Sequence, residues 1–345
     1  MTNKIKVGLI TNAAGAHVGA YLQALAAADL CDEVVLADPD GRWEDQARQV
    51  LGDKLKHVER DYRVLLRKHR PQLALITIEA RLAPPMIEDA LEANCHVFAE
   101  KPACVRSEDF APLVKKADSK HRHLMLALAN RTNPEIVAAR EIMQSGRIGK
   151  LYGLEMHLIA DQTRLTRPSY HEQWFARKDR GGGGHLIWLG IHWLDLAMYI
   201  TGASIVETAG FTTNIGGQPI DIEDSAVAAF RFDNGALGTV TSAYYLDKGY
   251  HSHIKIWGSS GWLHIEPMES RPLSWYTANG ENAGVVQTWD GSKEPRGYTP
   301  FVHAAIRACV QMTDPPISNA DSLRALKTVF AIYSAAAGGR ATKTQ

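Results

Sequence analysis

The first third of the chain alternates short apolar runs with helical stretches, and this rhythm restricts the fold more than any other feature. Because parallel strands need a crossover connection between them, strands that alternate with helices predict βαβ units. The runs are apolar at nearly every position, which predicts a sheet covered on both faces. Residues 1–128 are therefore predicted to form a doubly wound, Rossmann-type dinucleotide-binding domain, with strands at 5–10, 33–37, 73–78, 96–99 and 124–128.

From residue 129 onward the pattern changes to longer segments in which polar and apolar residues alternate. Alternation predicts strands with one packed face, and helices are expected to cover that face. Residues 129–345 are therefore predicted to be an α+β domain with a large, mostly antiparallel open sheet. Its last helix, expected over 321–337, could pack back on the first domain, and 268–297 is expected to be an irregular lobe or a hairpin. The expected strands are 151–159, 205–212, 225–232, 236–245, 251–257 and 262–266.

Charge and composition exclude several classes of partner. The 345 residues include 38 Lys and Arg against 38 Asp and Glu, so the formal net charge is zero. A neutral chain has no broad electrostatic attraction for nucleic acid or an anionic membrane. No run approaches the roughly 18 apolar residues of a membrane span, and no signal-peptide pattern is visible. The four cysteines are scattered without a CxxC pair, so we expect buried or idle thiols in a cytoplasmic protein.

The turn after the first strand is a candidate phosphate-binding loop. It is rich in small residues but keeps a single glycine, and its backbone N–H groups could contact a pyrophosphate. Asp38 follows the second strand and could accept hydrogen bonds from an adenosine ribose, which favours NAD over NADP. The alternatives are a tight turn without a ligand and, for Asp38, a turn or helix cap. The predicted contacts in the loop are Thr11, Asn12, Ala13, Gly15 and Ala16.

Lys101 is a candidate reactive residue because Glu100-Lys101-Pro102 directly follows the fourth predicted strand. Doubly wound sheets bind their ligands at this edge. A buried lysine there can hold a hydroxyl or carbonyl oxygen or relay its proton, and Glu100 is predicted to orient the ammonium group. The alternative is an ordinary exposed lysine in a loop.

A second candidate cluster follows the tetraglycine at 181–184. His185, Trp188, His192 and Asp195 are spaced to share one stripe of a helix whose remaining positions are largely apolar. A lone histidine would be interpreted as a core residue, but two histidines and an aspartate favour a ligand site.

The segment before the glycines adds candidate sugar contacts, since aromatic rings stack on sugars and arginines bind hydroxyls or carboxylates. A polar surface loop is the alternative for these residues, which are Arg164, Arg167, Tyr170 and Trp174. His251 and His253 share one face of a predicted strand and could ligate a metal, but half-exposed sheets often carry such pairs without one. We expect no metal site.

Several of these motifs together resemble the Gfo/Idh/MocA family, the glucose–fructose oxidoreductase and inositol dehydrogenase group, over essentially the whole chain. The motifs are Glu100-Lys101-Pro102, the glycines at 181–184, Gly190-x-His192-x-x-Asp195, Asn130-Arg131, Gly146-Arg147-Ile148-Gly149, Ile222-Glu223-Asp224 and residues 257–262. The resemblance implies an NAD(P)-dependent oxidoreductase of sugars or cyclitols.

The resemblance also implies roles for individual residues. Lys101 and His192 take the places of the family's lysine and histidine, and Arg131 is a candidate substrate contact. Glu79 falls in the family's Thr-Pro-Asn segment and is a candidate cofactor contact. The family aspartate four residues before the histidine is replaced by Trp188, which cannot exchange a proton and would stack on a sugar ring. The open sheet implies a homodimer or homotetramer.

Three functions follow as hypotheses. The first is an NAD-dependent oxidoreductase acting on a hydroxyl of a sugar, sugar acid or cyclitol, with Lys101 and His192 as the acid/base and oxygen-binding pair. The second is a redox-neutral glycoside-cleaving enzyme or lyase that uses NAD transiently. The third is a non-catalytic descendant that binds sugars or nucleotides, suggested by the missing glycines and aspartate.

Overall fold

The computed structural model describes residues 4–246 and 249–344 and divides the chain into two compact units. The first unit contains residues up to 129 and two later segments, 179–182 and 295–323. The second contains 130–178, 183–294 and the residues from 324 onward. The sequence analysis placed the boundary between the domains at residue 128 and did not assign these two later segments to the first unit.

The first unit is built on a six-stranded parallel sheet with the order β3-β2-β1-β4-β5-β6. This confirms the doubly wound fold. The prediction missed β3, an edge strand whose side chains are half-buried or exposed and which therefore lacks an apolar run. The strands are β1 Ile5–Thr11, β2 Cys31–Ala37, β3 Leu55–Glu59, β4 Leu73–Thr77, β5 His96–Ala99 and β6 Leu124–Leu126.

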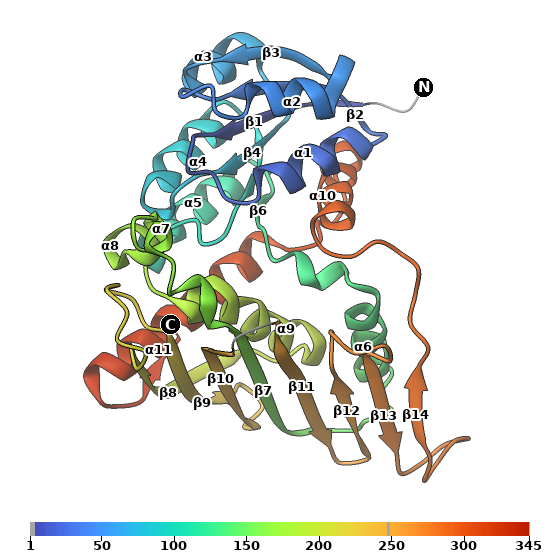
Figure 1. Ribbon diagram of the computed structural model, residues 1–345. Coiled ribbons are helices and arrows are strands. Elements are labelled where there is room, and N and C mark those ends of the chain that lie inside the picture. The colour runs from blue at the N-terminus through green and yellow to red at the C-terminus, as the bar shows by residue number, and fades with distance from the viewer. Residues whose placement is uncertain (1–3, 247–248, 345) are drawn as a thin grey trace. The chain divides into compact units, whose positions relative to one another are not determined.

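The helices of this unit include one from the far end of the sequence. Helix α10 lies beside α1 (Figure 1), and it buries Phe301, Val302, Ala305 and Ile306. Its apolar stripe was not recognised, because it follows a long polar segment. The helices are α1 Val18–Ala27, α2 Glu44–Leu51, α3 Tyr62–Val64, α4 Ala83–Glu92, α5 Ser107–Ser119 and α10 Tyr298–Gln311, and a π-turn at Leu65–His69 extends α3.

The second unit contains a nine-stranded sheet with the order β14-β13-β12-β11-β7-β10-β9-β8-β15. Only the β7–β10 pair is parallel among its described pairings, so the predicted mostly antiparallel sheet is confirmed. The segment expected to be a lobe or hairpin contains the antiparallel pair β13–β14. The strands are β7 Leu151–Asp161, β8 Ile205–Thr213, β9 Ser225–Phe232, β10 Leu237–Leu246, β11 His251–Gly258, β12 Gly261–Ile265, β13 Leu273–Thr277, β14 Val286–Trp289 and β15 Thr342–Lys343.

Helices cover one face of this sheet, as the arrangement of α6 and α9 above the strands shows (Figure 1). The strands bury alternate residues toward that side, including Met156, Val240 and Ile254. Their other side chains stay exposed, among them Phe211 and Leu237 at 81% and 57%. The helices are α6 Pro134–Gln144, α7 Pro168–His171, α8 Lys178–Gly181, α9 Ile191–Thr201 and α11 Asn319–Gly338; α8 and α11 each include residues of both units.

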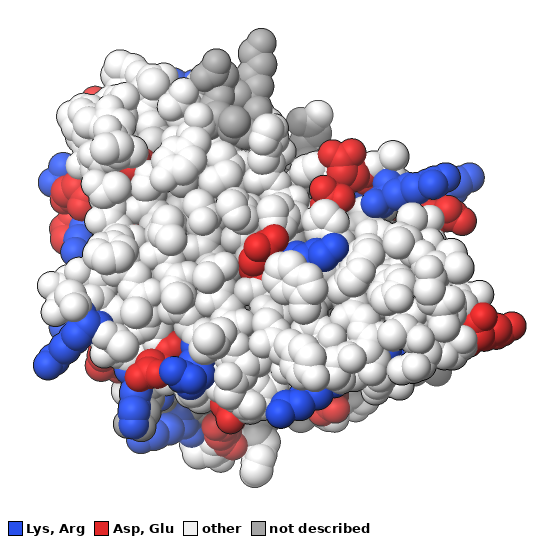
Figure 2. Space-filling view, turned by 90° about the horizontal axis from the view of Figure 1, so that it is seen from below, with Lys and Arg blue, Asp and Glu red and all other residues white. Residues whose placement is uncertain are grey.

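Charge is distributed in small mixed groups. In the face seen in Figure 2, Lys and Arg side chains lie beside Asp and Glu side chains, and most of the surface between them is uncharged. Among the described residues, no helix is both long enough and apolar enough to cross a membrane.

Candidate functional site

The turn after β1 is closed by its own asparagine. Asn12 Oδ1 accepts the Ala14 N–H at 3.0 Å, and the Asn12 carbonyl oxygen accepts the Gly15 N–H at 3.0 Å. A Cβ atom on Gly15 would overlap Thr11 Oγ1 and lie 2.8 Å from the Thr77 carbonyl oxygen of β4. The single glycine therefore occupies the point of closest approach between the turn and the next strand.

One backbone N–H group of this turn already donates a hydrogen bond to a carboxylate. The Ala13 N–H donates to Asp40 Oδ2 at 2.8 Å, and Trp43 Nε1 donates to the Asn12 carbonyl oxygen at 2.8 Å. Backbone N–H groups at such a turn are the donors that a pyrophosphate uses. A bound dinucleotide would therefore compete with Asp40 for the Ala13 N–H.

Asp38, directly after β2, is fully buried and has the hydrogen bonds of the predicted turn or cap residue. Its Oδ2 accepts the Trp43 N–H at 2.7 Å, next to the start of α2, and its carbonyl oxygen accepts the Gly41 N–H at 3.3 Å. Its Oδ1 is buried and has no hydrogen-bond partner within residues 4–246 and 249–344. A buried carboxylate oxygen without a donor fits a ribose hydroxyl, so the residues present fit an adenine dinucleotide.

Glu79, just after β4, is held by two arginines. Its Oε1 lies 3.0 Å from Arg180 Nε and 3.4 Å from Arg81 Nε, and its Oε2 pairs with Arg180 Nη2. The carboxylate raises the pKa of the Arg180 guanidinium through its hydrogen bond. The two cations compensate the negative charge of Glu79 near a turn that would hold phosphates, and its predicted contact with the cofactor remains a prediction.

Glu100 bonds the backbone of its neighbour Lys101 and two residues of the α1 region, Tyr21 and His17, that the sequence motifs did not indicate. Its Oε1 accepts the Lys101 N–H at 3.0 Å, and its Oε2 bonds the Tyr21 hydroxyl and lies 3.3 Å from His17 Nδ1. Burial and the negative charge of Glu100 raise the pKa of Tyr21 well above its usual value. The carboxylate therefore fixes the backbone from which the buried Lys101 side chain extends.

In the second unit, the predicted helical stripe is interrupted by a change of helix type. Leu186–Gly190 form a π-helical turn, and α9 begins only at Ile191. His185 faces the sheet, with Nδ1 2.6 Å from Ser242 Oγ and its ring 4.4 Å from that of Tyr244. His192 and Asp195 share α9 three residues apart, and both are buried. The continuous four-residue stripe was therefore wrong, because the π-turn rotates the residues before it relative to α9.

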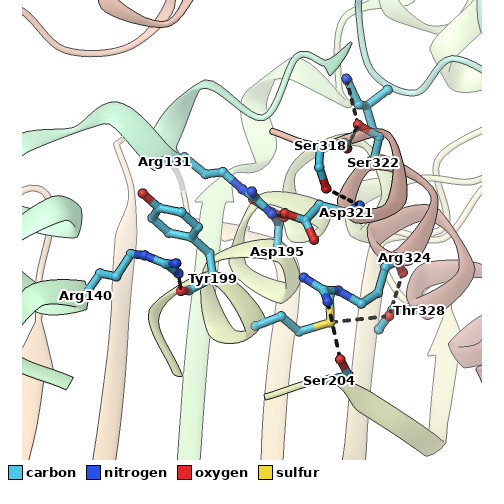
Figure 3. Close-up of polar contacts among 12 residues, drawn as sticks. Arg131, Arg140, Asp195, Tyr199, Ser204, Ser318, Asp321, Ser322, Arg324 and Thr328 are labelled. Carbon is cyan, nitrogen blue, oxygen red and sulfur yellow. Dashed lines mark hydrogen bonds and ion pairs between the residues drawn. The ribbon is translucent and has the colours of Figure 1, made fainter. Parts of the chain in front are cut away.

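Arg131 and Asp195, which were each predicted to contact the substrate, bind each other (Figure 3); contact of either with a substrate remains a prediction. Arg131 Nε lies 2.8 Å from Asp195 Oδ2, and Nη2 lies 2.6 Å from Oδ1. This bidentate pair is buried. The ring of Tyr199 lies against both Arg131 and Arg140, at 4.7 and 4.2 Å from ring centroid to guanidinium carbon. The pair fixes α9 to the segment just before α6.

An aromatic cluster surrounds Trp188. Its ring lies 5.4 Å from that of the buried Trp174 and 5.1 Å from that of Phe175, and Tyr170 lies 5.0 Å from Phe175. Trp188 is half-buried, so part of the indole remains accessible. Arg167 is exposed at the start of α7, and the side chain of Arg164 lies outside what the structure describes. Substrate contacts by these residues and by His185 remain predictions.

The histidines of the open sheet do not form a metal centre in the described part of the chain. His157 and His253 stack at 4.8 Å between centroids, and His253 Nε2 lies 3.5 Å from Glu155 Oε1. Burial lowers the pKa of His253. No group of three or more His, Cys, Asp or Glu side chains between residues 4 and 344, leaving out 247 and 248, is arranged to hold a metal ion.

Two known protein families match most of the chain. The family described as "Oxidoreductase family, NAD-binding Rossmann fold" matches residues 7–128. The one described as "GFO/IDH/MocA C-terminal domain" matches residues 136–264. Levoglucosan dehydrogenase of Pseudarthrobacter phenanthrenivorans is 23% identical over 60% of this chain and 59% of its own length. Uncharacterized oxidoreductase YrbE of Bacillus subtilis, at 25% identity, is matched over the same shares.

The chain thus spans about three fifths of the length of these two relatives, and other matches extend further. Myo-inositol 2-dehydrogenase of Thermotoga maritima is 22% identical over 91% of this chain and 92% of its own. Among solved structures, an oxidoreductase domain protein from Kribbella flavida superposes with a TM-score of 0.89 over the whole of both chains at 24% identity. Levoglucosan dehydrogenase in complex with NADH and levoglucosan has a TM-score of 0.86 over 99% of each chain, at 20% identity. The chain belongs to the Gfo/Idh/MocA family, with an amino-terminal NAD-binding Rossmann domain.

Proposed function

We propose that this protein oxidises a hydroxyl group of a sugar, sugar acid or cyclitol with NAD. The observation that carries the proposal lies within the first unit. The phosphate turn, Asp38 and Lys101 follow β1, β2 and β5, whose carboxyl ends lie at the same edge of one parallel sheet. Ligands of doubly wound sheets bind at that edge. A buried lysine there is placed to hold the oxygen of a substrate whose cofactor binds the same edge.

Bound NAD would supply the acceptor for the hydride of the substrate carbon. Asp38 would hold the ribose hydroxyls, and the turn would contact the pyrophosphate beside Asp40. The Lys101 ammonium would bind the reacting oxygen, and the His192 imidazole would take the hydroxyl proton as negative charge develops on that oxygen. Trp188 would present its accessible face to the sugar ring.

Redox-neutral cleavage of a glycoside, with NAD used transiently, is a second candidate. It is favoured by the replacement of the family's aspartate by Trp188, because this removes one proton-transfer group from the expected set. In such a reaction, oxidation of one carbon acidifies its neighbour, elimination breaks the adjacent C–O bond, and the hydride then returns to the product.

Release of the cofactor and a substrate panel test the proposal together. The purified protein is denatured, and NAD(H) or NADP(H) is sought by absorbance and mass spectrometry. The intact protein is then incubated with NAD and myo-inositol, levoglucosan, D-xylose or a methyl glucoside. NADH formation supports oxidation, whereas cleaved glycoside without net NADH supports the second candidate. Failure to contain or bind any nicotinamide nucleotide would contradict both and leave a non-catalytic role.

The open face of the second sheet supports a proposal about assembly. It carries exposed apolar side chains around a groove of about 480 Å³ that includes Ala209, Ala229 and Leu237. Extended apolar patches mark surfaces that bind other proteins, and we place the contact of a homodimer or homotetramer on this face. The four free cysteines are consistent with the reducing cytoplasm.

Asp38 is expected to select NAD. The unaltered protein should bind NADH more tightly than NADPH, because a buried carboxylate oxygen accepts ribose hydroxyls but repels a 2′-phosphate. Asp38→Ala should weaken NADH binding about tenfold and remove the preference, since hydrogen bonds to charged groups contribute about 1.5–3 kcal/mol. Fluorescence titration with both nucleotides measures this.

Asp40→Ala is the matched control for Asp38→Ala. It removes the same charge two residues away, but from a carboxylate that bonds the Ala13 N–H. It should change the affinity for both nucleotides in parallel, because both carry the pyrophosphate. Equal or tighter binding of NADPH by the unaltered protein would show that Asp38 acts only as a turn residue and cap.

Trp188→Asp is expected to raise the KM for the substrate identified in the panel about tenfold or more, since an aromatic stacking contact contributes about 0.5–1.5 kcal/mol beyond its buried area. Trp188→Phe is the control that keeps a flat apolar face and the packing against Trp174. It should change KM only a few-fold. Equal KM values for the two variants would place the indole away from the substrate.

A further inference from the structure

The backbone entering α9 is bound by one buried glutamate from a distant segment. Glu223 Oε2 accepts the Gly184 N–H at 2.7 Å, and Oε1 accepts the Leu186 N–H at 3.0 Å. The Glu223 carbonyl oxygen accepts the His185 N–H at 3.2 Å. Three consecutive N–H groups therefore bond to this residue, which lies just before β9 and is 8% exposed.

Tyr333 of α11 completes this arrangement. Its hydroxyl donates to Glu223 Oε1 at 2.8 Å and accepts the Ile187 N–H at 3.2 Å. The N–H groups of residues 184–187 thus all have acceptors on Glu223 or Tyr333. These are the N–H groups that the start of a helix leaves without partners inside the helix. A carboxylate at this position also interacts favourably with the helix dipole.

The same pair explains the glycines in front of the helix. A Cβ atom on Gly183 would overlap the Tyr333 hydroxyl, and one on Gly184 would overlap the Glu223 carbonyl oxygen. Any side chain at these positions would push the backbone away from its acceptors. The glycines are therefore needed for the close approach of the chain to Glu223 and Tyr333.

We propose that Glu223 and Tyr333 are positioning residues, which together cap the turn at 184–187 and thereby fix the placement of Trp188 and His192. The π-turn that begins at Leu186 contains Trp188 and continues directly into α9, where His192 is the second residue. Loosening of the cap shifts both side chains together. The link to catalysis rests on the proposed function, in which Trp188 and His192 contact the substrate.

The surroundings of Glu223 make the cap sensitive to its protonation. A polar cavity of about 290 Å³ lies beside Glu223 and Tyr333 and is also lined by Lys178 and Asp221. The neighbouring Asp224 is engaged by the N–H groups of Ile215 and Gly216. Burial raises the pKa of Glu223 above its ordinary value of 4.5, and its hydrogen-bond donors oppose this only in part.

The raised pKa of Glu223 means that acidification has opposite effects on the cap and on the stability of the folded protein. A carboxyl group with a raised pKa in the folded protein adds to stability at low pH, and this contribution is lost as the pH rises through that pKa. The ionised form, in contrast, accepts every donor of the cap, whereas protonation turns one oxygen into a donor. Acidification through the pKa of Glu223 therefore loosens the cap while the burial of the group becomes less unfavourable.

Hydrogen exchange of the full-length protein tests the proposal with Tyr333→Phe and Glu223→Gln. In both variants, the peptide covering 184–190 should exchange about tenfold faster, since hydrogen bonds to a charged group contribute about 1.5–3 kcal/mol. In the unaltered protein, protection of this peptide, corrected for intrinsic rates, should fall on acidification, and Glu223→Gln should abolish that pH dependence. If Glu223 had a purely structural role, Glu223→Gln would change the melting temperature but would leave the pH dependence of exchange at 184–190 unchanged.

Tyr62→Phe is the matched control. It removes a tyrosine hydroxyl that donates to the carboxylate of Asp89 at 2.7 Å in the first unit, and it should leave exchange at 184–190 unchanged. NADH affinity should stay within about twofold in all three variants, because the nucleotide residues lie on other elements. With a substrate from the panel, kcat should fall more in Tyr333→Phe than in Tyr62→Phe.

Unchanged exchange at 184–190 in both Tyr333→Phe and Glu223→Gln would overturn the cap. Faster exchange with unaltered kcat and KM would overturn its positioning role. If no panel compound reacts even with the unaltered protein, the proposed function fails, whereas the exchange experiment still decides whether the cap exists. Should Glu223→Gln fail to fold, Tyr333→Phe alone still tests the exchange at 184–190 and the change in kcat.

Discussion

Replacing Lys101 by alanine is expected to lower kcat by a factor of about one hundred or more, because a preorganised charge at the reacting oxygen typically contributes that much. NADH affinity should change little. The lysine side chain is buried directly after β5, and its backbone N–H is held by Glu100 Oε1 at 3.0 Å. Its position at the carboxyl edge of the sheet, where doubly wound folds bind their ligands, is the basis of the proposed contact with substrate oxygen.

Steady-state kinetics and NADH titration measure this effect, with two comparisons. Lys101→Met keeps the length of the side chain without its charge, so it should be as inactive as Lys101→Ala if the charge is what matters. Lys116→Ala removes a lysine whose partners are the surface residues Glu88 and Glu92, and it should leave kcat unchanged. Retention of more than about a tenth of kcat in Lys101→Ala would contradict an electrostatic role of the size expected.

Asp195→Leu is expected to destabilise the protein by about 3–5 kcal/mol, because it removes one partner of a buried, bidentate ion pair and leaves the charge of the other in place. The double variant Arg131→Met with Asp195→Leu should recover most of this loss, since both charges of the pair are then removed together. Denaturant unfolding of the single and double variants measures the coupling between the two residues. Both oxygens of Asp195 bind Arg131, so the effect on stability should exceed any direct effect on substrate binding.

The surface pair of Arg48 and Glu44 is the control for this experiment. Its nitrogen and oxygen are 2.7 Å apart at the i,i+4 spacing of α2, but the Arg48 side chain is 59% exposed. Arg48→Met should therefore leave the unfolding midpoint almost unchanged. If Asp195→Leu instead kept full stability and raised KM, Asp195 would act mainly as a substrate contact, which is the role that the sequence analysis predicted for it.

The ring of Tyr199 lies between Arg131 and Arg140 (Figure 3) and is affected by the double variant. A guanidinium group over an aromatic ring is attracted by its negative face. Removal of Arg131 in the double variant leaves Arg140 on the ring, so the packing of α9 against α6 is retained. The loss of Arg131 from the ring should therefore add little destabilisation in the double variant.

The sequence by itself determined the architecture and the positions of the main candidate residues. Short apolar runs separated by helical stretches predicted the parallel sheet of the first unit. Segments of alternating polar and apolar residues predicted the open, mostly antiparallel sheet of the second unit. Lys101 and His192 were found from their motifs and from the strand end that precedes Lys101. Where the local pattern was weak, the prediction failed: β3 lacks an apolar run, and α10 returns to the first unit after a long polar segment.

Only the tertiary structure decided which polar groups bind each other. Arg131 and Asp195 are 64 residues apart, and Glu223 and Tyr333 are 110 apart. Glu223 belonged to a recognised motif, whereas nothing in the pattern around Tyr333 indicated a role. Periodicity reports which face of one element is buried, because burial of a face repeats with the helix or strand period. The partner of a buried polar group depends instead on where distant segments meet in the folded chain, and no local repeat contains that information.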